Sequence, residues 1–326
     1  MIDKLHTFGK FLDQPMFIAK FEKSMPLLMT AGGAIALGKI SHDTFEKTND
    51  KKEREKLILS KAIVLSAAII SALFAPKAAS FVFPNREKLS SIPEVKEANK
   101  KLIDEFISKN NLDENIIDIL NKAKEKVLSY EEVKVLIKNI KNSDFMEKLI
   151  PDPVASTSKE IIQDIGYLSV YGAVPVIGGV LGGIAADNAT GKDVKQTIPD
   201  KIKEGAYQYL ANIFMCNVGA AAGLGILEAA KITSRAARAG AMIAGIILTG
   251  VIGGSKIANF ISKNFIDKFT KQPKNKKERT PEPLDLFLHT DDIATVSVLS
   301  GLKWIEPALP VLYSVSGYRA GIGYRN

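Results

Sequence analysis

Two uncharged runs, residues 165–186 and 205–227, constrain the fold of this chain more than any other feature. Neither contains Lys, Arg, Asp, Glu or His, and both are rich in Gly and Ala. A helix rises about 1.5 Å per residue, so each run would extend about 33 Å and could cross a hydrocarbon core roughly 30 Å thick. We therefore expect two membrane-spanning helices, joined into a hairpin by the short polar connection 187–204.

Further apolar stretches extend this pattern along the chain. Residues 57–83 and 239–262 read as additional membrane helices, whereas 25–38 is short and 293–318 is interrupted by charges and prolines. The sequence thus predicts an all-α protein, a multi-pass helical membrane bundle with four to six Gly/Ala-rich membrane segments and a small soluble helical module. Whether 25–38 and 293–318 span stays open.

The charge distribution separates the chain into five parts. We expect an amphipathic lead-in with the first two membrane segments, then a soluble helical module, a core membrane bundle of three helices, a basic proline-containing linker, and a C-terminal membrane or interfacial segment; these occupy 1–83, 84–160, 161–262, 263–292 and 293–326. The lead-in alternates apolar and lysine positions at helical spacing, which fits either a helix on the membrane surface or an ordinary soluble helix. The Tyr- and Arg-containing tail 318–325 is expected at the headgroup level.

The soluble module carries local helix signals. An apolar stripe is expected at Val95, Ala98, Leu102 and Phe106. Ser129 followed by Glu132, and Asn111 followed by Glu114, have the spacing of capping boxes, in which a short polar side chain and an acid satisfy free backbone donors at a helix start.

Small residues recur every fourth position in the strongest membrane segments. Lipid tails are as apolar as leucine, so helices in a bilayer associate where small residues let their backbones approach closely. We expect a tight intramolecular bundle, with oligomerisation or a glycine-lined pore as alternatives. The predicted packing positions are Gly178, Gly179, Gly182, Gly183, Gly219, Gly223, Gly250 and Gly254.

Polar residues within membrane segments are the candidate functional positions, because each is costly in lipid unless it is paired or hydrated. Amides occur at Gln208, Asn212 and Asn217, and a charged pair with helical spacing occurs at Lys303 and Glu306. The amides fit hydrogen bonding between helices or a substrate path, and the charged pair fits a membrane boundary or an ion-coupling site.

Catalytic and cofactor signatures are missing from the sequence. Cys216 is the single cysteine, so one chain forms no disulfide and no thiolate metal cluster. His289 beside Asp291 and Asp292 reads as an acidic helix start rather than a metal site. No serine-hydrolase, zinc-protease or phosphate-loop motif occurs. We predict no catalytic residue, no metal and no cofactor, and leave open whether the chain is an enzyme.

The predicted function is that of an integral membrane protein of structural or interaction type. A small transporter or channel is the alternative, and a membrane-active pore-forming or effector protein is the third. The net charge of +8 is mostly lysine flanking apolar runs, which is typical of cytoplasmic loops rather than of nucleic-acid binding. Expected partners are the lipid bilayer and a second copy or another membrane protein; the expected location is the bacterial cytoplasmic membrane. A large soluble bundle remains an alternative fold.

Overall fold

The computed structural model describes residues 2–86, 88–151, 158–232, 235–266, 268 and 303–323, and within these ranges the chain is helical without strands. It divides into two compact units. Unit 1 comprises Met1–Met25, Glu87–Ser156 and Ser300–Ala308, and unit 2 comprises Pro26–Arg86, Thr157–Leu299 and Leu309–Asn326. Most of the predicted linker 263–292, and His289, Asp291 and Asp292 with it, lie outside the described residues.

Unit 1 is a cluster of short helices. It contains α1 (Ile2–Leu12), the first turns of α2 (Pro15–Lys47), α4 (Ile92–Lys109), α5 (Glu114–Ala123), α6 (Tyr130–Asn139), α7 (Ser143–Leu149) and the 3-10 turn η4 (Lys303–Ala308). Large apolar side chains fill its core, among them Ile103, Leu120 and Leu136, each 0% exposed. The rings of Phe106 and Phe145 stack at a centroid distance of 3.7 Å. The lead-in belongs to this unit, since Phe11 packs against the same core.

Capping fixes the helix starts in unit 1. Ser129 and Glu132 form the predicted capping box at α6, and Ser91 with Glu94 forms another at α4. The box expected at Asn111 is wrong: α5 begins at Glu114, with Asp113 at its N-cap. The apolar stripe of α4 also departs from the prediction, because Asn99 rather than Ala98 is buried.

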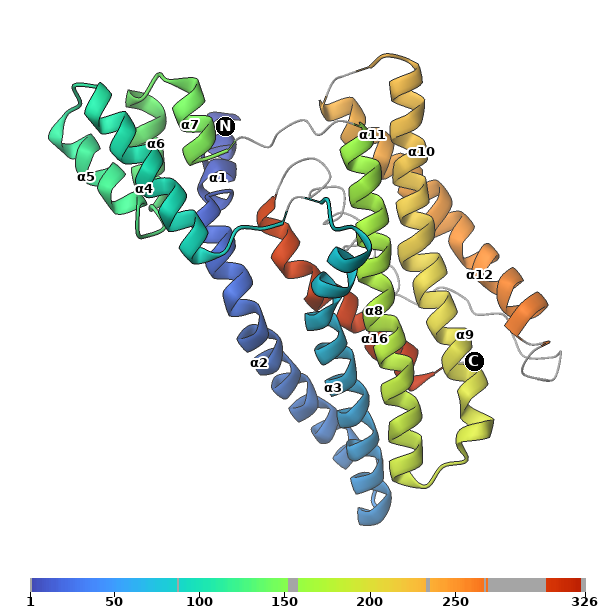
Figure 1. Ribbon diagram of the computed structural model, residues 1–326. Helices are drawn as coiled ribbons and strands as arrows, with labels where there is room; N and C mark the ends of the chain where they lie inside the picture. Colours follow the sequence, from blue (N-terminus) through green and yellow to red (C-terminus); the bar gives the residue numbers. More distant parts are fainter. Residues whose placement is uncertain are drawn as a thin grey trace. The chain divides into compact units, whose positions relative to one another are not determined.

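Unit 2 consists of longer helices (Figure 1). They are the rest of α2, α3 (Lys51–Val82), α8 (Ser158–Thr190), α9 (Val194–Tyr209), the π turn η1 (Leu210–Phe214), α10 (Met215–Ala229), α11 (Arg235–Ile246), the π segment η2 (Ile247–Gly254), α12 (Ser255–Ile261), the π turn η3 (Ser262–Ile266) and α16 (Leu309–Ile322). Helix α8 packs against α3, α16 and α9, and α10 packs against α11.

Several glycines of unit 2 lie where helix backbones approach closely. A Cβ added to Gly179 would overlap the carbonyl oxygen of Gly317, and one added to Gly183 would overlap that of Gly321. On the neighbouring face of α8, a Cβ on Gly178 would overlap the side chain of Ser71 of α3. The two interleaved glycine pairs of α8 therefore serve two different helices, α16 and α3.

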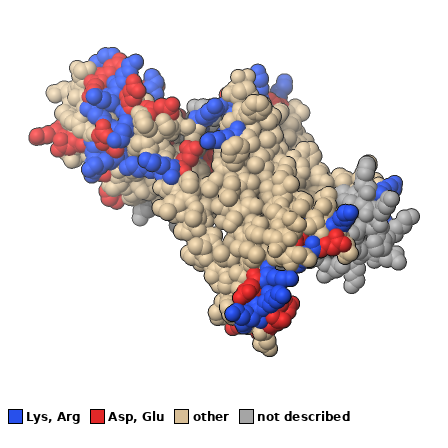
Figure 2. Space-filling model, turned by 60° about the horizontal axis from the view of Figure 1, so that its bottom comes forward, with Lys and Arg blue, Asp and Glu red and all other residues tan. Residues whose placement is uncertain are grey.

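Three helices are long and apolar enough to cross a membrane: α3, α8 and the continuous helix α9–η1–α10. Only 17% of the most apolar part of α3 is buried. Figure 2 shows a broad surface without acidic or basic side chains, with charges gathered in separate clusters. The segment 239–262 contains a shorter apolar helix, Gly240–Gly250. Among the described residues, the segments 25–38 and 309–322 do not belong to helices that are both long and apolar enough to cross a membrane.

Candidate functional site

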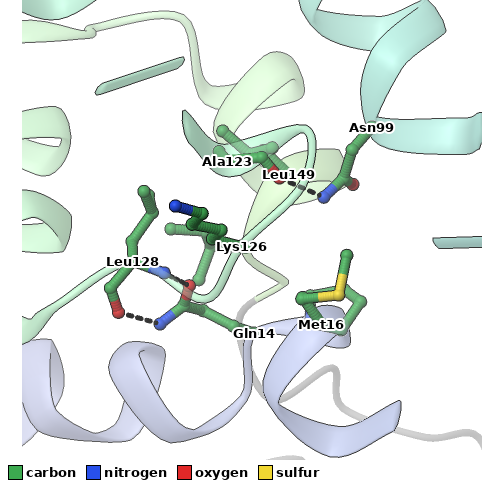
Figure 3. A pocket seen from close by; sticks show the side chains of 9 residues that line it. Gln14, Met16, Asn99, Ala123, Lys126, Leu128 and Leu149 are labelled. Carbon is green, nitrogen blue, oxygen red and sulfur yellow. Dashed lines mark hydrogen bonds between the residues drawn. The ribbon is translucent and has the colours of Figure 1, made fainter. Parts of the chain in front are cut away.

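A small pocket in unit 1 is the first place where polar side chains converge (Figure 3). Gln14, at the break between α1 and α2, donates through Nε2 to the carbonyl of Leu128 at 3.0 Å and accepts from its N–H at 2.8 Å. Asn99 donates to the carbonyl of Ala123 at 3.0 Å. These amides satisfy backbone groups where α5 ends and α6 begins, so the pocket ties the lead-in to the short helices and is structural.

The predicted pair Lys303 and Glu306 lies in unit 1, on η4. In the same turn the N–H of Trp304 donates to Asp13 at 3.3 Å. Glu306 is buried. Burial and, second, the charge of Glu306 raise the pKa of Glu22 above its ordinary value.

The second convergence of polar groups lies inside unit 2 and is the candidate functional site. Along α9, η1 and α10 a row of polar side chains is buried from end to end, with exposed fractions of 5% or less. We call this row the buried polar line; its members are Lys201, Glu204, Gln208, Asn212 and Asn217. From Lys201 to Asn217 it extends about 24 Å along the helix axis.

The π turn keeps this line on one face. Glu204, Gln208 and Asn212 follow one another at intervals of four, but Asn217 comes five residues later. In an α-helix, five residues turn by about 500°, which would place Asn217 about 140° around the helix from Asn212. In η1 the N–H of Met215 bonds to the carbonyl of Leu210, so the turn holds one extra residue and compensates for the longer interval.

A ladder of hydrogen bonds connects three members of the line. Asn212 Nδ2 donates to Gln208 Oε1 at 3.0 Å, and Gln208 Nε2 donates to Glu204 Oε1 at 2.8 Å. Further along, Asn217 Nδ2 donates to Ser169 Oγ of α8 at 2.9 Å. The predicted amides therefore share one buried face. Asn212 and Gln208 form a chain of hydrogen bonds that leads to the carboxylate of Glu204.

Two buried ion pairs complete the site. Lys201 Nζ lies 2.9 Å from Asp187 Oδ2 of α8 and donates to the carbonyl of Gly321 of α16 at 3.0 Å. Glu204 Oε1 lies 3.9 Å from Nε of Arg319, also on α16. Side chains of Glu204 and Arg319 are 0% and 1% exposed. The first pair is in direct contact, whereas the second is a longer charge interaction.

Arg319 belongs to the tail whose position in a membrane stays a prediction. A Tyr- and Arg-containing end is expected at the headgroup level; within unit 2, Arg319 lies on α16 and is buried. Asp187, Lys201 and Glu204 lie just outside the two uncharged runs. They were therefore not among the polar residues predicted within membrane segments. Helical spacing from Gln208 back to Glu204 was the signal that could have identified the carboxylate.

The remaining predicted glycines also lie at helix contacts. A Cβ on Gly182 would overlap Ala67 of α3, and one on Gly219 would overlap Gly245 of α11. The other three would meet neighbours in the same way: Gly223 against Ala241, Gly250 against Cys216, and Gly254 against Ala211.

One cluster of possible metal-binding side chains occurs among the described residues, at His42, Asp43 and Glu46 on α2. Its nitrogen–oxygen distances are 3.8 and 3.9 Å, and its side chains are 41% to 72% exposed. Exposed side chains on one helix face at these distances are typical of a solvated surface.

No protein-family model, curated protein or solved structure matches this chain.

Proposed function

We propose that this chain is a multi-pass integral membrane protein of structural or interaction type, resident in a bacterial cytoplasmic membrane. The observation that carries the proposal is the outer surface of unit 2, where large apolar side chains face outward on several helices. Lipid would cover such a surface, whereas water would not. Examples from α2, α3, α8 and α10 are Leu27, Ile35, Ile70, Phe74, Leu181 and Ile226, each at least 58% exposed.

The chain order of unit 1 supports an even number of crossings. A compact unit rich in exposed charges lies on one side of a bilayer. The chain leaves unit 1 after Met25 and returns at Glu87, so the part between must cross an even number of times. Because α3 is long and apolar enough for one crossing, the rest of α2 would supply the other.

The chain also leaves unit 1 after Ser156 and returns to it at Ser300, so the part between would likewise cross the bilayer an even number of times. Helix α8 and the continuous helix α9–η1–α10 account for two crossings. A third crossing within 235–266 would require a fourth before residue 300. The proposal is therefore four crossings by α2, α3, α8 and α9–α10, with α11 to α12 and α16 packed beside them.

Single-cysteine labelling in a background without Cys216 tests this arrangement. Asn49→Cys in the α2–α3 connection and Lys195→Cys in the first turn of α9 should react on one side of the membrane. Lys138→Cys on α6 should react only from the other side. Equal reaction of all three from one side of intact vesicles would contradict the four-crossing arrangement, and release of the protein by carbonate would contradict membrane integration.

The buried polar line favours a second candidate, a small transporter or channel. Paired ionisable groups inside a membrane bundle are expensive and often mark ion or substrate pathways. Glu204, Arg319, Asp187 and Lys201 form two such pairs. Solute counterflow in proteoliposomes would support transport, and vesicles no more permeable than protein-free ones would support the structural function.

A further inference from the structure

Helix α16 is enclosed by other helices of unit 2 along most of its length. It packs against α8, α3 and α9 (Figure 1). The structure describes every residue from Leu309 to Gly323, and of these only Val311 is exposed. The long helix α3 shows the opposite pattern, since 17% of its most apolar part is buried. Helix α16 therefore lies inside unit 2 rather than on its surface.

The contacts of α16 advance in step with those of α8. The ring of Tyr313 lies 5.6 Å from the ring of Tyr171, and a Cβ added to Gly183 would overlap the carbonyl oxygen of Gly321. The two helices therefore run in the same direction. From Tyr171 to Gly183, α16 accompanies the uncharged run of α8 for about 18 Å along the helix axis.

Helix α3 gives the same depth from the opposite direction. A Cβ added to Gly317 would lie 3.3 Å from the Cβ of Ala68, and one added to Gly321 would overlap the side chain of Val64. Residue numbers rise along α16 while they fall along α3, so these two helices are antiparallel. Val64 lies near the start of the uncharged stretch 62–76 of α3, which places the end of α16 at the edge of the apolar part of unit 2.

Helix α16 ends among polar groups. Lys201 Nζ donates to the carbonyl of Gly321 at 3.0 Å and lies 2.9 Å from Asp187 Oδ2. Gly323, with a φ of 88°, closes the helix through a 3.3 Å bond from its N–H to the carbonyl of Arg319. Asp187 and Lys201 flank the connection between α8 and α9, which the arrangement proposed above places on the side opposite unit 1.

The sequence of α16 is poorly suited to enter a bilayer alone. Its 14 residues extend about 21 Å, against a hydrocarbon core of roughly 30 Å. The described helices that are long and apolar enough to cross a membrane do not include it. It also carries Arg319, which is costly in hydrocarbon unless it is paired, and Arg319 Nε lies 3.9 Å from Glu204 Oε1. The close backbone contacts and polar groups that this helix needs come from α3, α8 and α9.

We propose that α3, α8 and α9 form a binding groove for one short helix, and that α16 passes through the bilayer in this groove to the side opposite unit 1. This inference rests on the membrane placement proposed above. The last stretch of unit 1 ends at Ala308, so the even number of crossings required of the earlier stretches does not limit α16. The groove fits a helix with small residues four apart, Gly317 and Gly321, and with Arg319 between them at the level of Glu204.

A protease-cleavable epitope added after Asn326 tests the passage in vesicles. Lys195→Cys and Lys138→Cys, each without Cys216, identify the two sides. The epitope should be cleaved from the side on which Lys195→Cys reacts. If a carbonate-resistant chain were cleaved only from the side of Lys138→Cys, or equally from both, this inference would be overturned and membrane integration would stand. Release of the chain by carbonate would overturn both.

Two valine variants test whether the groove is needed. Gly321→Val and Gly183→Val change the same backbone contact from its two sides. Either should reduce cleavage from the side of Lys195→Cys about tenfold or more, because an arginine-bearing segment outside its groove stays out of hydrocarbon. Gly225→Val, at a glycine with no atom within 4 Å of an added Cβ, is the matched control and should behave as wild type.

The two variants also guard against a failure to fold. Gly321→Val leaves α3, α8 and α9 unchanged, so these helices should remain resistant to carbonate even if Gly183→Val does not insert. Cleavage of the Gly321→Val epitope from the side of Lys195→Cys at the wild-type level would overturn the groove as the means of passage.

Discussion

The two units use opposite means to bring helices together. In unit 1, large side chains such as Ile103, Leu120 and Leu136 fill the space between helices, and exposed charges form surface pairs such as Lys109 and Glu105. In unit 2, glycines let helix backbones come into contact, as at Gly179 against Gly317, and charged pairs such as Glu204 and Arg319 lie inside. This difference is the one expected if, as proposed, water surrounds unit 1 and lipid surrounds unit 2. In water, the burial of large apolar side chains drives helices together. In lipid this driving force is missing, so helices associate through close backbone contact and through hydrogen bonds between buried polar groups.

The largest expected effect is in the core of unit 1. Leu120→Ala should destabilise this unit by about 2–5 kcal/mol, because it removes a fully buried side chain and leaves a cavity. Thermal unfolding followed by fluorescence of Trp304, the single tryptophan, measures it within unit 1. Lys138→Ala on α6 is the exposed control. If Leu120→Ala left the Trp304 transition unchanged, the side-chain core would not be what holds unit 1.

Next in size is the glycine contact in unit 2. Gly179→Ala should cost about 1–3 kcal/mol, since its Cβ would overlap the carbonyl of Gly317 and the helices must separate. The buried thiol of Cys216 should then react faster with a thiol reagent.

Gly225→Ala is the matched control for that variant. No atom lies within 4 Å of its added Cβ, so it should slow Cys216 labelling or leave it unchanged, because Ala favours a helix over Gly by about 1 kcal/mol. Equal behaviour of the two variants would show that glycine is used in α8 and α10 for some reason other than close packing.

A smaller effect is expected at the helix starts of unit 1. Ser129→Ala removes the side chain that accepts from the N–H of Glu132 and should cost about 1 kcal/mol. The Trp304 transition should shift slightly, while Cys216 labelling stays as in wild type. Ser129→Asp keeps an acceptor and should retain most of the stability; a loss as large as with Ala would argue against capping.

The smallest effects are pH-dependent and opposite in sign. The pKa of Glu94 is lowered by hydrogen bonds from Ser91, first from its backbone N–H, so ionised Glu94 stabilises α4 above pH 4.5 and this contribution is lost as pH falls through the folded-state pKa. The pKa of Glu22 is raised, so ionised Glu22 opposes folding above its folded-state pKa and ceases to do so below pH 4.5.

Glutamine variants separate these two contributions. At neutral pH, Glu94→Gln should lower the Trp304 transition temperature and Glu22→Gln should raise it. Both differences should disappear in acid. A Glu22→Gln variant less stable than wild type at neutral pH would reverse the assignment for that carboxyl group.

Much of the helical content follows from local sequence. The uncharged run 165–186 lies within α8, and 205–227 lies within α9 to α10, because length and composition alone decide such helices. The capping box at Ser129 is equally local. The amides Gln208, Asn212 and Asn217 were recognisable as polar groups in apolar surroundings.

The partners of these groups depend on contacts far along the chain. Gly317 meets Gly179, and Arg319 meets Glu204, from a short helix near the C-terminus whose sequence alone reads as interfacial. The π turn at Leu210–Phe214 leaves no composition signal, yet it decides whether Asn217 shares a face with Asn212. The burial of Asn99 likewise depends on the carbonyl of Ala123, which belongs to the next helix.

Unit 1 is assembled from three separate stretches, and this has a consequence for biosynthesis. Ribosomes release the chain from its first residue onward, so Met1–Met25 and Glu87–Ser156 emerge long before Ser300–Ala308. The turn that binds Asp13 through Trp304 is among the last parts to be made. The earlier helices of unit 1 must therefore persist as an unfinished assembly while α8 to α12 are synthesised, and a chain that stops before residue 300 would leave Asp13 without the hydrogen bond from Trp304.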